Sequence, residues 1–399
     1  MAWSAANWLN RGGELLASDP ALAQRLLARG IREEPQQPVA YYNLGISLHQ
    51  QGRIGAAIRA YQHCLRLPKA PLLQARNNLS QDLLLAGQWP AGWELYRHRF
   101  ARKPGNYPHF QRLFGAPQRT PLAPGQTLLM MSEQGFGDTL QFCRFGLELQ
   151  ALGLQVILLS QPALVALLRE GSGLARVEPQ LCADDLGPGP VGWLPLLDLP
   201  AHLGCKPDRI PHAQGYLHAD PDRVCQWRER LQRVPGRRLI ALHWQGNPGH
   251  ETSLYSRGRS MLFEHWLGLR GVEGVEFVSI QKGAGSEQLR LDAGLPFVAG
   301  QAAVAASMDF RDTAAVLAQC DLLLSADSGV VHLAGAMGVP TWVGLRHVPE
   351  WRWGLQGDQT AWYRSLRLFR QPRDGDWASV VQGMREALIN PASGARLPD

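Results

Sequence analysis

Two short segments that lie far apart in the chain restrict its fold most strongly. Residues 131–139 and residues 327–335 each follow an apolar run of strand length and open a stretch with helical composition. A strand followed by a glycine-containing turn and a helix is the repeating unit of an open parallel α/β sheet, and such sheets bind ligands at the carboxyl ends of their strands. The two segments therefore predict an α/β protein with both turns at its ligand site.

The residues at these turns are those of a group-transfer site. The first turn offers a carboxylate, Asp138, next to glycines. The second offers the Ser328 hydroxyl, backbone N–H groups and His332 at the start of a helix, where the helix dipole favours a phosphate. A base on one side and a phosphate site on the other form the outline of a transferase.

Strand and helix patterns alternate along the chain on both sides of a break near residues 205–222. The predicted strands are continuous apolar runs at 127–131, 155–160, 175–178, 191–194, 238–244, 275–281, 321–325 and 340–345. Apolar strands separated by helices predict parallel sheets covered on both faces. We therefore expect two Rossmann-like domains, residues 126–215 and 216–399, with a C-terminal helix near 375–389 that returns to the first half.

The N-terminal quarter contains an internal repeat. Residues 38–67 recur about 35 positions later, with Tyr61 matching Tyr96, and a degenerate earlier copy spans residues 9–36. The pattern resembles the tetratricopeptide repeat, in which helix pairs stack around a concave groove. Two roles stay open for this helical part (residues 1–104), namely docking of a peptide or protein and packing without a peptide ligand. A Pro- and Gly-rich stretch, residues 105–125, is predicted as a linker.

Composition excludes several classes of protein. The net charge is +6, yet the chain has only four Lys and no Lys/Arg block of the kind that binds nucleic acid. No apolar run reaches the roughly 18 residues of a membrane span, and the N-terminus lacks the pattern of a signal peptide. The cysteines show no CxxC spacing. We therefore expect a cytoplasmic protein with no transmembrane segment and no nucleic-acid partner.

Four motifs occur in a fixed order at residues 133–142, 244–260, 279–283 and 309–332, followed by an aromatic tail at 349–372. Together they resemble bacterial glycosyltransferases related to the lipopolysaccharide heptosyltransferases, and in particular the subgroup with an N-terminal tetratricopeptide domain. The resemblance covers nearly the whole chain. It implies the two-Rossmann GT-B fold, a nucleotide-sugar substrate, inversion at the anomeric carbon, and no metal or other cofactor. Two stretches depart from the pattern, Tyr255-Ser256 and the loop 344–350, which differs from the Pro-rich version common in relatives.

Asp138 has two interpretations. A direct displacement needs a base for the acceptor hydroxyl, and the resemblance implies that role for Asp138. An aspartate at this position also suits the start of the helix predicted over 139–152, which its side chain would cap.

The second turn likewise has two interpretations. The resemblance implies that Asp327, Ser328, Gly329 and His332 hold the donor diphosphate, whereas capping by Asp327 or Ser328, with His332 packed against the sheet, is the alternative. Further donor-side candidates are the cations and polar residues of the middle motifs, Asn247, His250, Arg257, Arg259, Ser260, Gln281 and Lys282. The acceptor-side candidates are Gln134, Gly135 and Gly137. No metal site is expected, because the two Asp-x-Asp pairs, at 220–222 and 374–376, stand at predicted helix starts.

The sequence thus favours a bacterial glycosyltransferase that moves a sugar from a nucleotide-sugar donor to an acceptor hydroxyl, with a protein acceptor suggested by the repeats. Two alternatives stay open. One is a tetratricopeptide scaffold with a non-catalytic nucleotide-sugar-binding domain, and the other is a transferase directed at lipopolysaccharide or another glycan. The sugar, the nucleobase and the oligomeric state are not determined by the sequence.

Overall fold

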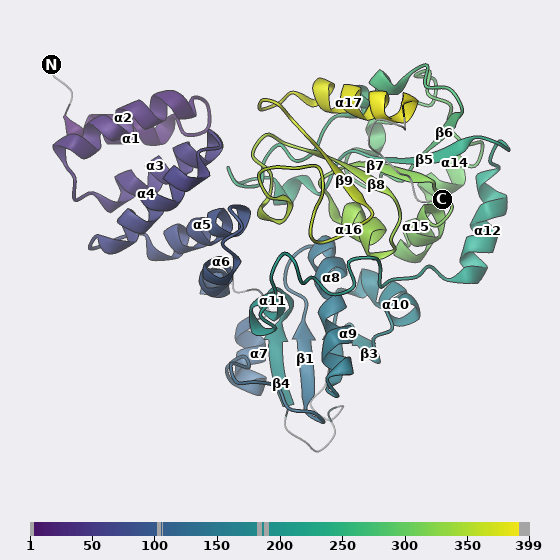
Figure 1. Cartoon of the computed structure of the whole chain (residues 1–399), viewed down its shortest axis with the longest axis horizontal. Helices are drawn as coiled ribbons and strands as arrows, with labels where there is room; N and C mark the ends of the chain where they lie inside the picture. The colour runs from purple at the N-terminus through teal and green to yellow at the C-terminus, as the bar shows by residue number, and fades with distance from the viewer. Residues whose placement is uncertain (1–3, 102–104, 106, 182–185, 187–190, 391–399) are drawn as a thin grey trace. The chain divides into compact units, whose positions relative to one another are not determined.

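A computed structural model describes residues 4–101, 105, 107–181, 186 and 191–390, and the chain divides into two compact units (Figure 1). Unit 1 comprises Met1–Pro108 together with two later segments, Thr252–Arg257 and His347–Gln356. Unit 2 comprises His109–Glu251, Gly258–Arg346 and Gly357–Asp399. The helical unit therefore takes in two segments from the second half of the chain, which the sequence did not predict.

Unit 1 consists of successive helices that pack as antiparallel neighbours. They are α1 (Ala5–Glu14), α2 (Pro20–Glu33), α3 (Pro38–Gln50), α4 (Ile54–Arg66), α5 (Leu72–Leu85) and α6 (Trp89–Tyr96). Each pair meets at a glycine: a Cβ built on Gly12 would lie 2.7 Å from Leu27, and one built on Gly45 would lie 2.5 Å from the Tyr61 ring. Glycine at these positions lets the two helices approach closely, so the repeat in the sequence corresponds to a repeated helix contact.

Unit 2 contains two parallel sheets. The strands are β1 (Thr127–Met131), β2 (Gln155–Leu159), β3 (Arg176–Glu178), β4 (Val191–Pro195), β5 (Arg238–His243), β6 (Val275–Ser279), β7 (Leu322–Ala326), β8 (Thr341–Leu345) and β9 (Leu366–Arg370). Their order is β3-β2-β1-β4 in the first sheet and β6-β5-β7-β8-β9 in the second. This confirms the prediction of Rossmann-like α/β domains behind a helical N-terminal region. The predicted strands are all present, and β9 is additional.

Helices connect and cover these strands. They are α7 (Tyr107–Phe114), α8 (Phe136–Phe142), α9 (Arg144–Ala151), α10 (Pro162–Gly171), α11 (Leu199–His202), α12 (Pro221–Leu231), α13 (Phe263–Trp266), α14 (Gln301–Ala306), α15 (Phe310–Leu317), α16 (Gly329–Ala336) and α17 (Trp377–Ile389). Helix α7 lies within the stretch predicted as a linker, and its Phe110 packs 5.5 Å from the Trp193 ring of β4. The helix predicted over 139–152 is divided into α8 and α9, which meet at Cys143.

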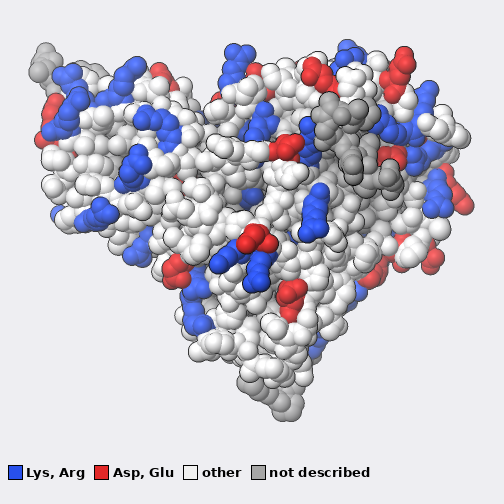
Figure 2. All heavy atoms as spheres, viewed as in Figure 1, with Lys and Arg blue, Asp and Glu red and all other residues white. Residues whose placement is uncertain are grey.

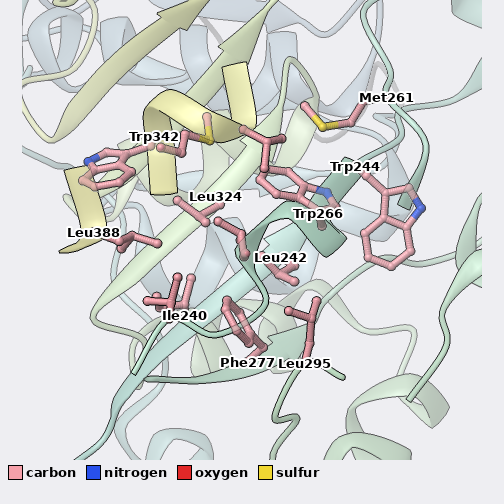
Figure 3. Packing of buried hydrophobic residues seen from close by; sticks show 14 of the residues in the cluster. Ile240, Leu242, Trp244, Met261, Trp266, Phe277, Leu295, Leu324, Trp342 and Leu388 are labelled. Carbon is pink, nitrogen blue, oxygen red and sulfur yellow. The ribbon is translucent and has the colours of Figure 1, made fainter. Parts of the chain in front are cut away.

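The second sheet carries a large apolar core on the side covered by α13 and α17 (Figure 3). Leu242 and Leu324 lie on neighbouring strands and are fully buried among the rings of Trp244, Trp266 and Trp342. Burial of one such leucine stabilises the fold by about 2 kcal/mol. Because α17 packs on β8, β9 and α13, the expectation that the last helix returns to the first half is wrong.

A buried arginine joins the two halves of unit 2. Arg144 of α9 is fully buried, and its Nη1 donates to the Trp362 carbonyl oxygen at 2.7 Å. Its guanidinium lies over the rings of Tyr216 and Tyr363, each 4.5 Å from the ring centroid. A buried cation is stable only when its donors are paired, so this arrangement fixes the segment that follows β8 against the first half.

The charged residues are spread over the surface. On the face shown in Figure 2, Lys and Arg are scattered among Asp and Glu instead of gathering in one patch. In the described part of the chain, no helix combines the length and the apolar character that crossing a bilayer requires.

Candidate functional site

The strand orders bring the turns after β1 and β7 to the edge of their sheets at which α/β proteins bind ligands. Strand β5 lies between β6 and β7, so the connections leave β5 in opposite directions and open a crevice at its carboxyl end. The turn after β7 leads into α16 at this crevice, and the turn after β1 leads into α8. The fold thus places both segments where an open α/β sheet binds its ligand.

The first turns of α8 and α16 are in direct contact, as the adjacent positions of the two helices in Figure 1 indicate. A Cβ built on Gly137 would lie 2.8 Å from His332 Cδ2 and 3.0 Å from Gly329 Cα. Real Cβ atoms do not approach other atoms so closely, so only glycine fits at position 137. The sequence predicted both turns at the ligand site, and the structure brings their backbones into contact.

Asp138 stands next to this contact. It is half-buried, and its Oδ2 accepts a hydrogen bond from the Gly135 N–H at 2.9 Å. The side chain therefore caps α8, as the second interpretation predicted, although the helix begins at Phe136 and not at residue 139. A carboxylate has further acceptor positions, so capping and a role as a base are compatible.

The start of α16 is open to an anion. Ser328 is its N-cap residue but makes no side-chain capping bond, and within the described residues the N–H groups of Gly329 and Val330 have no hydrogen-bond acceptor. The Ser328 hydroxyl instead pairs with His243 Nδ1 at 3.1 Å. These amides and the helix dipole are suited to bind a phosphate oxygen. His332 is buried one turn later, where its Nδ1 pairs with the Tyr363 hydroxyl at 3.0 Å.

His243 is a site residue that the sequence did not reveal. It ends the apolar run of β5, where its position gave no sign of a ligand contact. Burial lowers the pKa of its imidazole to about 4, so the ring is neutral near pH 7 and can form one hydrogen bond with Ser328 through Nδ1.

The loop after β5 adjoins the start of α16. A Cβ built on Gly246 would lie 4.0 Å from Ser328 Cβ, and the Gly246 N–H donates to Ser260 Oγ at 3.0 Å. Ser260 Oγ donates in turn to Glu251, whose carboxylate also accepts the backbone N–H groups of Arg259 and Ser260 at 3.2 and 3.3 Å. Glu251 therefore closes the base of this loop, a role that the sequence did not predict.

Arg259 precedes Ser260, which binds the loop after β5. The Arg259 backbone is fixed by Glu251, while its Nε is buried and, within the described part of the chain, has no hydrogen-bond partner. A buried guanidinium nitrogen without an acceptor is costly, and a phosphate oxygen would remove that cost.

Several other candidates are not gathered at the start of α16. Lys282 Nζ donates to the Val304 carbonyl oxygen in a cavity of about 10 Å³, and burial lowers its pKa to about 8. Gln281 is buried and binds backbone groups of the loop, its Oε1 accepting from Trp244 N and Gln245 N at 3.0 Å.

Arg257 belongs to unit 1, where its Nη2 donates to the Ala17 carbonyl oxygen and to Gln50 Oε1, both at 3.0 Å. Asn247 and His250 are exposed on the loop after β5, and Asn247 Oδ1 accepts the Gly249 N–H at 2.9 Å. Gln134 is exposed, with its carbonyl oxygen bound to Gln161 Nε2 at 3.1 Å, while Asp327 is buried beside Ser328.

A metal centre was not expected from the sequence. Among the residues that the structure describes, no group of three or more His, Cys, Asp and Glu side chains lies close enough together to hold a metal ion. Asp376 caps α17, as predicted. In the other pair the capping residue is Asp220, and Asp222 lies in the first turn of α12.

Part of unit 2 is similar to a known protein family. Residues 277–345, which run from β6 through α16 to β8, match Glycosyltransferase family 9 (heptosyltransferase). This part of the chain is similar to that family, and the matched region includes the open start of α16.

Similarity to individual proteins is lower but extends over more of the chain. Over 384 residues the sequence is 26% identical to Protein FlbA of Caulobacter vibrioides, covering 90% of this chain and 62% of that relative. The chain therefore spans about 62% of the length of the curated protein it matches.

Two solved structures are similar to about two thirds of this chain. The glycosyl transferase family 9 protein from Veillonella parvula is 14% identical with a TM-score of 0.48, over 69% of this chain and 100% of that one. The E. coli ADP-heptose lps heptosyltransferase II is 12% identical with a TM-score of 0.42, over 67% of this chain and 100% of that one.

The contact between the two turns predicts a cost for Gly137→Ala. The added methyl group would overlap His332 and Gly329, so we expect unit 2 to lose about 1–3 kcal/mol of stability in urea unfolding. Gly135→Ala is the matched control, because a Cβ there meets only Asp138 Oδ2 at 3.5 Å, and it should cost less than about 1 kcal/mol. Equal stability of the two variants would contradict the contact.

The buried His243 predicts a pH effect on stability. Its folded pKa of about 4 lies below the ordinary 6.5, so the unfolded chain binds more protons between these values. Stability should therefore fall as the pH drops from 6.5 toward 4, by up to about 3 kcal/mol. Urea unfolding over this range should show a weaker pH dependence for His243→Asn than for the wild type, whereas parallel curves would show that His243 is not buried in its neutral form.

Proposed function

We propose that the chain is an inverting, metal-independent glycosyltransferase of the GT-B class, and that the contact between the first turns of α8 and α16 forms its catalytic centre. The observation that carries this proposal is the position of Gly137 against Gly329 and His332. It sets Asp138 beside the open start of α16, so a base and a site for the leaving group lie at one junction between the two halves of unit 2.

On the donor side, the diphosphate of a nucleotide sugar binds at the start of α16. The N–H groups of Gly329 and Val330 donate to its oxygens, and Arg259 supplies a positive charge that has no other partner in the described residues. The negative charge on the diphosphate grows as the bond to the anomeric carbon breaks, and fixed donors stabilise that charge most in the transition state. His332, held by Tyr363, contributes a further contact to the donor.

On the acceptor side, Asp138 takes the proton of the acceptor hydroxyl. The acceptor oxygen then forms a bond to the anomeric carbon, and the electrons of the broken bond leave with the nucleoside diphosphate. A single displacement inverts the anomeric carbon. Gln134, Gly135 and Gly137 belong to the turn beside Asp138, and the acceptor binds on this side of the site.

For the acceptor itself we propose a protein, bound by the helices of unit 1 as a tetratricopeptide stack. A hollow of about 330 Å³ supports this part of the proposal. It is lined by residues of α1, α3 and the turn between α2 and α3, among them the amides of Asn10 and Asn43. Within the described residues these two amides have no hydrogen-bond partner, so they are open to a peptide backbone.

The base is tested by Asp138→Asn. The amide can still accept the hydrogen bond from the Gly135 N–H, but it cannot take a proton, so we expect release of nucleoside diphosphate with acceptor to fall about 10²–10⁴-fold. Binding of nucleoside diphosphate should stay within about threefold of the wild type, a shift of roughly 0.7 kcal/mol.

The matched control is Asp376→Asn. Asp376 also caps a helix, α17, where it accepts from the Ser379 N–H at 3.1 Å, and it should tolerate the change with full activity. Turnover should be measured with a panel of nucleotide sugars and, as acceptor, a protein extract compared with a glycan extract. Wild-type turnover by Asp138→Asn would exclude Asp138 as the base.

A further inference from the structure

The loop Thr252–Arg257, which comes from the second half of the chain, packs against the helices of unit 1. The Tyr255 ring stacks on the His49 ring of α3, with centroids 3.8 Å apart and planes inclined by 23°. Its hydroxyl lies 2.8 Å from the Tyr61 hydroxyl of α4 and 3.4 Å from Asp82 Oδ2 of α5. A residue far along the chain thus joins three helices of the repeat.

Tyr255 completes a buried polar network. His49 and Asp82 are 3% and 0% exposed, and His49 Nδ1 lies 2.7 Å from Asp82 Oδ1. Burial raises the pKa of Asp82, while His49 and the Tyr255 hydroxyl oppose that shift. Buried polar groups are costly unless they are hydrogen-bonded, so the helices and the loop depend on each other.

Two further sets of contacts hold segments from the second half of the chain against the helices of unit 1. Arg257 donates to the Ala17 carbonyl oxygen and to Gln50 Oε1, both at 3.0 Å. The second segment of unit 1 that comes from this half, His347–Gln356, places the buried Trp351 ring 5.1 Å from Trp93 of α6 at 84°. The two stretches that depart from the family pattern, Tyr255-Ser256 and 344–350, therefore overlap the segments that belong to unit 1.

The base of the loop carries donor-site residues. Glu251 precedes the segment Thr252–Arg257, and its carboxylate binds the backbone of Arg259 and Ser260, which follow it. Arg259 is only two residues beyond Arg257, so its position depends on both ends of a short loop whose Tyr255 contacts three helices of unit 1.

We propose that Tyr255 is a positioning residue for the donor site: by anchoring the loop tip in unit 1 it orders Arg259 for binding of a nucleoside diphosphate. This rests on the proposed function of Arg259. The helical unit then serves the glycosyltransferase directly, through a loop of the donor site, in addition to any acceptor that it binds.

The experiment measures binding of ADP, UDP, GDP and CDP to the full chain by calorimetry. With the nucleotide that binds the wild type, we expect Tyr255→Ala to weaken binding tenfold or more. Tyr255→Phe keeps the ring on His49 and loses only the hydroxyl bonds, so it should weaken binding less, by two- to fivefold. In turnover assays the KM for the donor should rise while the KM for the acceptor stays unchanged.

The double variant separates positioning from general destabilisation. If Tyr255 acts through Arg259, Tyr255→Ala combined with Arg259→Ala should bind no more weakly, within twofold, than Arg259→Ala alone. Leu27→Ala is the control, because it opens a cavity in the helical core at α2, away from the residues of this loop, and should leave nucleotide binding unchanged.

The outcomes distinguish this inference from the function on which it rests. A wild-type chain that binds none of the four nucleotides overturns the proposed function and the inference with it. The inference alone is overturned if the wild type binds a nucleotide and Tyr255→Ala binds it with full affinity. It is also overturned if the losses of affinity from Tyr255→Ala and Arg259→Ala multiply in the double variant.

Discussion

The contact of Gly137 with Gly329 and His332 is the interaction on which the rest of the site depends. Each sheet of unit 2 has its own core, and each ends at a turn that leads into a helix. Because no side chain intervenes at Gly137, the two helix starts meet, and Asp138 directly follows the residue that touches α16, whose first amides no group of the described chain satisfies. The buried Arg144 supports this junction by joining α9 to the segment around Trp362 and Tyr363.

Much of the fold could be predicted because its signals are local. The apolar runs of the parallel strands and the glycine turns after β1 and β7 depend on neighbouring residues, and the strand order then brings the turns to one crevice. The direction of single side chains was harder to predict. Lys282 follows a strand end as expected, yet its ammonium binds the Val304 carbonyl oxygen, since the packing of α14 determines where a long side chain can be paired.

The residues that the sequence did not reveal act through distant partners. His243 lies in a strand, and only the pairing of β5 with β7 brings Ser328 to its ring. Glu251 lies in a loop, and only the return of the chain at Ser260 gives its carboxylate a partner. Tyr255 was noticed only as a departure from a family pattern. Its place among α3, α4 and α5 could not be predicted, because no local signal specifies a contact with residues almost 200 positions earlier.

The most direct test of the account is a crystal structure of the full chain with the nucleoside diphosphate that it binds. We predict that the terminal phosphate accepts hydrogen bonds from the Gly329 and Val330 N–H groups and contacts Arg259, with Asp138 facing the site of the anomeric carbon. A phosphate bound elsewhere, for example at Lys282, with the start of α16 left empty, would contradict it.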